Sequence, residues 1–134
     1  MSMPTQLPVS PVSEKEERSS SRLKLITAVI RPEKMSEVFE SLNQCNLVGG
    51  ITMTDIRGNN RAPVVRQHCG VPFIVRVVGC VKVEVVVSVD DAHDVVECIR
   101  AAASTGHVGD GKIWVTDVSA MVRIRTGEKG LAAL

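Results

Sequence analysis

Apolar and polar positions divide the chain into a polar N-terminal stretch and a domain of alternating strands and helices. Residues 1–22 are rich in serine, proline and charged residues, with too little apolar surface to offset the entropy lost on ordering, so we expect a disordered tail. Residues 23–31 are apolar on both faces of an extended chain, which predicts a central strand. Pro32 suits the first turn of a helix, and apolar residues then recur at helical spacing: Met35, Val38, Phe39, Leu42 and Cys45.

A long segment without clear periodicity follows this first strand and helix. The pair Gly49-Gly50 ends the predicted helix, and residues 51–57 predict a second strand. From residue 58 to about residue 71 the apolar spacing is lost and glycine, asparagine and proline gather, so we expect a loop. The apolar run 73–78 would extend the next strand outward as a ribbon.

The second half of the domain repeats the order of the first. Alternating valines between residues 81 and 89 predict a third strand with one apolar face. The aspartates at residues 90–91 are expected to cap a second helix, whose apolar positions lie within residues 92–103. Residues 113–118 predict a fourth strand, and residues 122–125 predict a short further one.

This order of elements predicts an α+β fold of the ferredoxin-like type, a split βαβ unit used twice, with a long loop between the second and third strands. Aromatic residues make up only 2% of the chain, and the valine-rich strands leave the second face of the sheet without an evident cover. We therefore expect other copies of the chain to help cover that face.

Composition excludes several classes of function. The 134 residues carry a net charge of +1, without the basic excess that is typical of nucleic-acid-binding proteins. No apolar stretch is long enough to span a membrane, and the N-terminus lacks the basic and apolar regions of a secretory signal. We therefore expect a cytoplasmic protein that neither binds nucleic acid nor inserts into a membrane.

The four cysteines, Cys45, Cys69, Cys80 and Cys98, form no CxxC pair and have no spacing that suits zinc. In a cytoplasmic protein this predicts reduced thiols and no metal site. A redox role for Cys69 and Cys80, which lie in or beside the expected loop, is the alternative.

A glycine-rich stretch after the second helix carries the most informative chemistry. Gly109 and Gly111 allow the backbone to approach a ligand with exposed N–H groups, and Lys112 adds a positive charge. Arg123 and Arg125 alternate on the expected last strand, so both would project from one face and grip phosphate oxygens. Together these residues indicate a polyphosphate site, although the Walker A spacing is absent. A plain turn between helix and strand is the alternative.

These residues resemble the PII family of nitrogen and carbon regulators. Residues 105–118 match the family's C-terminal signature, and the motifs at residues 123–128 and 30–32 match as well, within a resemblance that spans about residues 23–130. It implies a homotrimer with an adenine nucleotide (ATP, ADP or AMP) in each cleft between neighbouring subunits. The cations would bind phosphates, and two valines would flank the base. Carried over by position, the nucleotide site would comprise Val29, Thr52, Gly58, Glu84, Val86, Gly109, Asp110, Gly111, Lys112, Arg123 and Arg125.

The resemblance also implies that the loop after Gly58 is the family's T-loop, about residues 58–80, which docks onto a target protein. Residues 131–134 would form a short C-terminal tail. The chain has no tyrosine, and the loop has no serine or threonine. Uridylylation or phosphorylation of a loop hydroxyl therefore has no acceptor in this chain.

Two further departures concern the family's binding of Mg-ATP together with 2-oxoglutarate. Ala62, or its neighbour Arg61, stands where the family has a glutamine, and Cys80 stands where it has a lysine. Asn60 replaces the loop's second glycine. Without the metal-ordering amide and the ammonium that pairs with a carboxylate, we expect weak or absent 2-oxoglutarate binding, and the role of Mg²⁺ stays open.

The loop is instead basic, and it contains no acid but carries Arg57, Arg61, Arg66 and Arg76. These arginines favour contact with a small anion or with an acidic partner, and a solvated basic loop is the alternative. PII-like proteins linked to inorganic-carbon uptake or to carboxysomes resemble this chain in their loop losses. The resemblance suggests bicarbonate as a ligand held beside the nucleotide.

The leading hypothesis is a regulator that is not an enzyme. Nucleotide binding would bias the loop, and a transporter, an enzyme or a carboxysome-linked component would read it. A nitrogen regulator of an ammonium transporter or a nitrogen-assimilation enzyme is one alternative. A small nucleotide hydrolase and a structural trimer with a degenerate pocket are the others. The hydrolase lacks an evident general base, since Asp110 is the only acid within the Gly-Asp-Gly-Lys turn.

Overall fold

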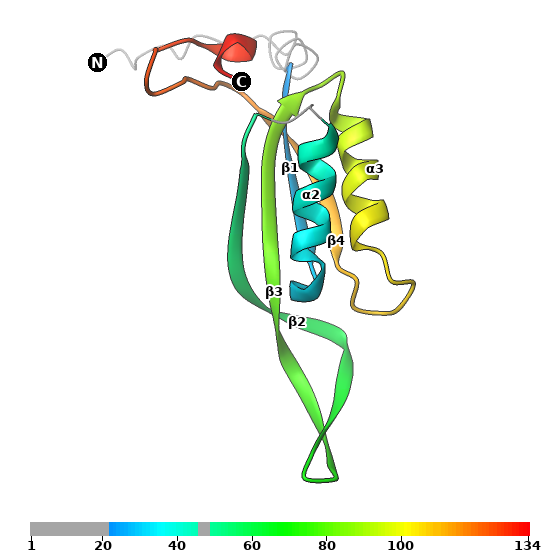
Figure 1. Cartoon of the computed structure of the whole chain (residues 1–134). Coiled ribbons are helices and arrows are strands. Elements are labelled where there is room, and N and C mark those ends of the chain that lie inside the picture. The colour runs from blue at the N-terminus through cyan, green and yellow to red at the C-terminus, as the bar shows by residue number, and fades with distance from the viewer. Residues whose placement is uncertain (1–21, 46–48) are drawn as a thin grey trace, which may run out of the picture.

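A computed structural model gives the chain a four-stranded antiparallel sheet with helices on one face (Figure 1). β1 (Leu23–Ile30) lies inside the sheet, between β3 (Val71–Ser88) and β4 (Lys112–Val118). β2 (Ile51–His68) pairs with β3 and forms the edge opposite β4. This is the ferredoxin-like α+β architecture that the order of elements predicts, with the first strand in the central position expected for it.

The structure describes residues 22–45 and 49–134, and in the β2–β3 ribbon it leaves out the side chains of residues 59–64, 66 and 73–76. The tail expected for residues 1–22 therefore lies outside the described residues, apart from its last residue. The same holds for the side chains of Asn60, Arg61, Ala62, Arg66 and Arg76, on which expectations about the loop's chemistry depend.

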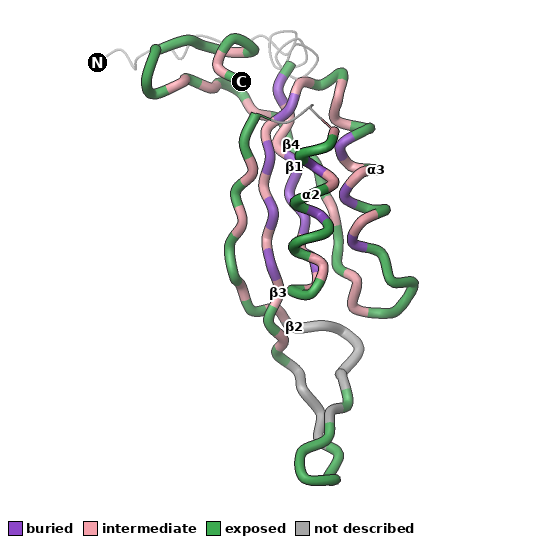
Figure 2. The backbone as a smooth tube through the Cα atoms, viewed as in Figure 1, coloured by how far each residue is buried: buried purple, intermediate pink, exposed green. Residues whose placement is uncertain are grey.

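Apolar residues between the sheet and the helices form the core (Figure 2). A short 3-10 turn, η1 (Pro32–Lys34), leads into α2 (Met35–Cys45), and α3 (Ala92–Ala103) lies beside α2. Alternate residues of β1 and β3 point at the helices, and residues about one turn apart in each helix point back at the sheet. The buried core comprises Ile26, Ala28, Ile30, Val38, Leu42, Val81, Val83, Val85, Val87, Val95, Ile99 and Ala103.

The start of α3 differs from expectation in one respect. Asp91 occupies the N-cap position, but its side chain makes no capping hydrogen bond. Its φ of −99° and ψ of −9° lie in the helical region. A capping side chain reaches the first free N–H groups from an extended backbone, so Asp91 is placed as predicted without acting as a side-chain cap.

The opposite face of the sheet carries a mixed set of side chains, and within the described residues no α-helix packs on it. By alternation β1 presents Leu25, Thr27 and Val29 to this side. Thr27 lies between Glu84 of β3 and Trp114 of β4 in the register and is only 5% exposed, whereas Trp114 is 45% exposed. The face therefore presents one half-exposed aromatic side chain.

The loop predicted from residue 58 to about residue 71 is wrong, because β2 continues to His68. The connection to β3 is the two-residue turn Cys69-Gly70, which has positive φ values of 52° and 79°. The pairing runs from Ile51 opposite Val85 to His68 opposite Val71, with one irregularity between Asn59 and Val64. The expected outward extension of the third strand is confirmed, and it supplies the partner for the distal half of β2.

The short strand predicted at residues 122–125 is also wrong. Only Val122 forms an isolated bridge, with Lys129, and a tight turn separates the two. The Arg123 N–H donates to the Glu128 carbonyl at 2.8 Å, and the Gly127 N–H donates back to the Arg123 carbonyl at 2.8 Å. Gly127, with a φ of +74°, allows the chain to reverse before a strand can form.

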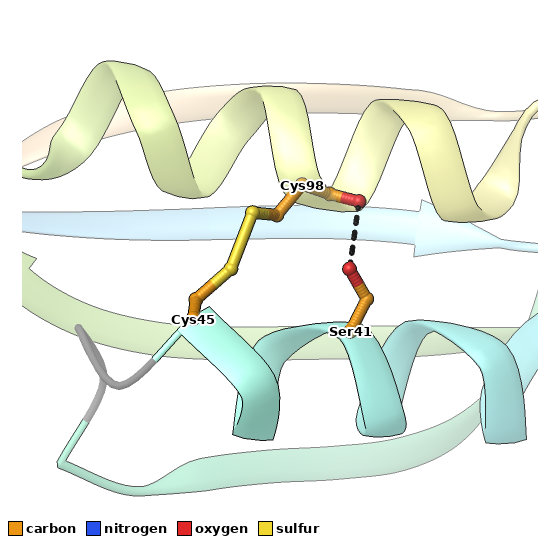
Figure 3. The surroundings of a disulfide bond; sticks show 3 residues. All are labelled: Ser41, Cys45 and Cys98. Carbon is orange, nitrogen blue, oxygen red and sulfur yellow. Dashed lines mark hydrogen bonds between the residues drawn. A yellow bond between two sulfur atoms is a disulfide. The ribbon is translucent and has the colours of Figure 1, made fainter.

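The structure joins Cys45 and Cys98 in a disulfide, which corrects the expectation of four reduced thiols. Figure 3 shows Cys45 at the end of α2 facing Cys98 on α3, with the Ser41 Oγ donating to the Cys98 carbonyl at 3.4 Å. The two cysteines are 53 residues apart, and only the packing of the helices brings them together. Cys69 and Cys80 are free.

Candidate functional site

The glycine-rich turn between α3 and β4 lies directly against the end of β1. Gly111 has a φ of +97°, and a Cβ there would lie 1.7 Å from the Val29 carbonyl oxygen. Gly109 has a φ of +103°, and its Cβ would lie 3.1 Å from Nη2 of Arg31. Gly111 therefore requires glycine for backbone conformation and for space, whereas Gly109 requires it for backbone conformation and is closely approached only by the end of the Arg31 side chain.

The Asp110 carboxylate holds this turn together from inside. It accepts hydrogen bonds from the Thr105 N–H at 2.9 Å, the Gly106 N–H at 3.0 Å and the Thr105 hydroxyl. The bonds from Thr105, with help from Arg31 and the Gly106 N–H, hold the pKa of Asp110 well below its usual range. The Asp110 carboxylate is thus engaged by neighbouring residues of the turn, so a ligand would meet the backbone N–H groups of the turn instead. The same hydrogen bonds make Asp110 a poor general base.

Arg31 is a residue of this site that sequence reasoning did not include. It follows β1 directly, and its Nε donates to Asp110 Oδ1 at 3.0 Å while its Nη2 donates to the Val108 carbonyl at 2.8 Å. The Ile-Arg-Pro motif was the only signal for it, and that motif served only as a mark of family resemblance.

Lys112 begins β4 and pairs with Val29, which on its other side pairs with Lys82. These residues and the turn form a first group of predicted site residues, at the end of β1 nearest the ribbon (Figure 1). Gly58 pairs with Val78 where the ribbon leaves the sheet. A cavity of about 340 Å³ lies beside it, lined by Pro32, Asp55, Ile56, Arg57, Gly79 and Cys80.

A second group lines a larger cavity of about 550 Å³. It contains the predicted residues Thr52, Glu84, Val86 and Arg123, together with Leu25, Gly49, Gly50, Ile51, Met121, Ala133 and Leu134. Arg123 Nη1 lies 3.3 Å from Glu128 Oε1, and its Nη2 donates to the Leu134 carbonyl. The segment η2 (Gly130–Ala133) thus places the residues expected as a tail against this cavity.

Arg125 does not accompany Arg123. The prediction that both project from one face required a strand, and the observed turn places Arg125 within it. Arg125 is not among the residues that line the larger cavity. Of the loop arginines, Arg57 lines the smaller cavity, and the side chains of Arg61, Arg66 and Arg76 lie outside the described residues.

One chain does not bring the two groups together. Val29 pairs with Lys112 and Leu25 pairs with Val86, four residues apart on β1. At about 3.3 Å per residue these rows are roughly 13 Å apart along the strand. The α3–β4 turn and the C-terminal segment accordingly lie at opposite ends of the sheet in Figure 1.

Among the described residues no helix is long and apolar enough to cross a membrane.

Comparison with known proteins places these features in a family. The model of the family described as "Nitrogen regulatory protein P-II" matches residues 23–128. The nitrogen regulatory protein P-II of Rhizobium meliloti is 44% identical over 113 residues, which are 84% of this chain and 100% of that protein. P-II 1 of Methanothermobacter thermautotrophicus is 41% identical over 113 residues, 84% of this chain and 97% of its own.

A solved structure agrees in fold. The crystal structure of Arabidopsis thaliana PII bound to citrate matches with a TM-score of 0.70 and 33% identity, covering 87% of this chain and 95% of that chain. The family match covers most of this chain, including the predicted site residues of both groups. The chain therefore belongs to the nitrogen regulatory protein P-II family.

Proposed function

We propose that this protein is a signalling protein that binds an adenine nucleotide between the subunits of a homotrimer and reports through its β2–β3 ribbon. The observation that carries the proposal is the separation of the predicted site into two half-sites. The first half-site is Val29 with Gly109–Lys112, and the second is the cavity that contains Thr52, Glu84, Val86 and Arg123.

The two half-sites are chemically complementary. The first offers a cation on Lys112 and a glycine-rich backbone suited to phosphate oxygens. The second offers an apolar wall at Leu25 and Val86, a carboxylate on Glu84 and a guanidinium on Arg123. A nucleotide has an apolar base at one end and a polyanion at the other, so two copies joined with these halves in contact would bind it at both ends.

The open face of the sheet supports the association of chains that this site requires. Trp114 is 45% exposed on that face, and Leu25 and Val86 lie on the same face, two residues further along the register. An exposed apolar surface of this kind is typical of an interface. We propose, as expected from the sequence, that the protein acts in the cytoplasm.

The β2–β3 ribbon is the element that a target protein would bind. It projects beyond the helix layer (Figure 1), and its base carries Arg57 beside Cys80. A nucleotide that prefers one position of the ribbon would shift the population that a transporter, an enzyme or a carboxysome-linked component binds. The target itself is not identified.

We propose that the signal concerns inorganic carbon, with bicarbonate held near the ribbon arginines. Cys80 lines the cavity at the ribbon base, and a thiol does not pair with a carboxylate as an ammonium would. We therefore expect no tight, ATP-dependent binding of 2-oxoglutarate in calorimetry with Mg²⁺. We expect bicarbonate to raise ADP affinity, and a titration in which it does not would count against the carbon reading and favour a nitrogen target, in line with the names of the relatives.

Mixing two variants tests the shared site. Lys112→Ala removes the cation of the first half-site, and Arg123→Ala removes that of the second. Neither variant alone should bind nucleotide. After unfolding and joint refolding, each mixed trimer would contain one interface with an intact Lys112 facing an intact Arg123, so an equal mixture should regain about a quarter of the wild-type sites.

The control joins two changes in the same half-site. Arg123→Ala mixed with Glu84→Ala leaves no interface with an intact second half, so this pair should restore nothing. A Lys112→Ala and Arg123→Ala mixture that binds no more nucleotide than its separate components would exclude a site shared between chains. Steady phosphate release by the wild type above the Lys112→Ala background would instead favour the hydrolase.

A further inference from the structure

The guanidinium of Arg31 lies over the glycine-rich turn and holds it from outside. Its Nε and Nη2 contact Asp110 and the Val108 carbonyl at 3.0 and 2.8 Å, on either side of Gly109 in the sequence. A Cβ at Gly109 would lie 3.1 Å from Nη2, 3.6 Å from Cζ and 3.7 Å from Nη1. The first distance is tight and the other two are ordinary van der Waals contacts, so the guanidinium lies close against Gly109.

We propose that Arg31 is a positioning residue for nucleotide binding: it fixes the glycine-rich turn against β1 and offsets the charge of Asp110, without itself belonging to the set of residues expected to touch the ligand. The proposal rests on the proposed function for its binding consequence, and on the contacts of Arg31 for its structural part.

The backbone of Arg31 is well suited to this task. It follows the buried residue Ile30 at the end of β1 and precedes Pro32, whose ring restricts the residue before it to extended conformations. Its φ of −65° and ψ of 141° agree with that restriction. Arg31 is therefore anchored in the core sheet on one side and in η1 on the other, and only its side chain reaches the turn.

Arg31 also compensates the negative charge that Asp110 places in the turn. Asp110 is ionised at neutral pH, since hydrogen bonds from Thr105 and Arg31 lower the pKa of its carboxyl group. A carboxylate beside a phosphate would repel it. The Arg31 guanidinium at 3.0 Å compensates that charge, and both side chains are only about a quarter exposed, at 26% and 25%, so screening by solvent is limited.

Three variants separate the positioning of the turn from the compensation of the Asp110 charge. Arg31→Gln removes the charge and the paired contacts, whereas Arg31→Lys keeps the charge but has no planar fork to contact Asp110 and the Val108 carbonyl together. Lys34→Gln is the matched control, because Lys34 lies three residues further on, is 22% exposed and pairs with Glu37 at 3.1 Å outside the turn. It removes the same charge from the same region.

Nucleotide titrations measure the consequence for binding. Arg31→Gln should weaken ATP binding about tenfold or more, and the loss should grow from AMP through ADP to ATP, because each further phosphate meets the uncompensated carboxylate. Arg31→Lys should recover part of the affinity, and Lys34→Gln should bind as the wild type does. In an Asp110→Asn background the effect of Arg31→Gln should shrink, as expected of a residue that acts through Asp110.

Hydrogen exchange without nucleotide measures the turn itself. Arg31→Gln should speed exchange of the Thr105 and Gly106 amides about tenfold, since these donate to Asp110, and Lys34→Gln should not. Unchanged exchange in Arg31→Gln overturns the positioning role, whatever the binding result. If exchange quickens but the wild type binds no adenine nucleotide, the positioning of the turn stands and the proposed function fails.

Discussion

The contact between Gly111 and β1 shows, at the scale of one residue, how tightly the glycine-rich turn is seated. A Cβ at Gly111 would lie 1.7 Å from the Val29 carbonyl oxygen, and its φ of +97° is strained for any L side chain. Gly111→Ala must displace either the turn or β1. We expect urea denaturation to show a loss of about 3 kcal/mol in the free energy of unfolding.

Gly106→Ala is the matched control for this prediction. Gly106 also has a positive φ, +80°, but nothing lies within 4 Å of a Cβ built there. Its replacement should cost only the backbone strain, about 1–2 kcal/mol. Equal losses for the two variants would contradict the close approach of Gly111 to β1.

The sequence predicted which residues form the turn, but it did not predict which of them would hold the turn together. The Gly-Asp-Gly-Lys motif predicted a turn whose backbone could approach a ligand, and Gly109 and Gly111 have the positive φ values that such a turn needs. Asp110 was grouped with the binding residues by its position in the family resemblance. Its carboxylate is instead engaged by Thr105 and Arg31, and contacts between residues 79 positions apart leave no pattern in a single sequence.

At the scale of an element, the α3–β4 turn should make stability depend on acid. The pKa of Asp110 is lowered in the folded chain, first by Thr105 and then by Arg31 and Gly106, relative to about 3.9 in an unfolded chain. Below pH 4 the unfolded chain takes up a proton that the folded chain does not, so this contribution falls as the pH drops further.

Thermal unfolding between pH 6 and pH 2.5 measures this effect. Asp110→Asn should be less stable than the wild type near neutrality, and the difference should narrow steadily below about pH 4. Asp90→Asn serves as control, because its carboxylate makes no hydrogen bond to the turn. A constant difference across this range would mean that the Asp110 carboxylate does not hold the turn in its ionised form.

The ribbon shows why the sequence did not predict the distal half of β2. Strand 81–89 was predictable because alternate valines face a core, and those at residues 81, 83, 85 and 87 are buried. The distal half of β2 lies beyond the helix layer and has no core to alternate against (Figure 1). Its order comes from pairing with β3, and backbone hydrogen bonds leave no periodic signal.

The disulfide between α2 and α3 leads to a prediction for the pair of helices. Its loop of 53 residues would add up to about 4 kcal/mol through the entropy of the unfolded chain. The Cα atoms are 7.5 Å apart, wider than the usual range of about 4.4–6.8 Å, so we expect a smaller gain. Dithiothreitol should lower the melting temperature of the wild type and leave Cys98→Ser unchanged.

Cys69→Ser is the control for the disulfide, because Cys69 is free and exposed. This variant should respond to dithiothreitol as the wild type does. A wild type that melts at the same temperature with and without reductant would show that Cys45 and Cys98 do not form a stabilising bond in solution.

At the scale of the whole molecule, the sequence suggested which chemical groups form the site, and the family resemblance placed that site between subunits. Lys112 and Arg123 are only 11 residues apart in the chain, yet a single chain does not bring them together. The structure places Lys112 beside Val29 and Arg123 in the cavity near Leu25, at opposite ends of the sheet. β4 runs from one end of the sheet to the other between these two residues, so they are far apart in space although they are close in the sequence.

Assembly can therefore be tested through the open face of the sheet. Trp114 is 45% exposed there, and burying a carboxylate at an interface without a partner is costly, so Trp114→Glu should dissociate the proposed trimer. Phe39→Glu is the control, since Phe39 is 49% exposed on α2, in the helix layer on the other side of the sheet. Light scattering after size exclusion should give a trimer for Phe39→Glu and a monomer for Trp114→Glu. In the proposed assembly each half-site needs its neighbour, so nucleotide binding should be lost at the same protein concentration as the trimer. A Trp114→Glu monomer that binds nucleotide normally would refute the shared site.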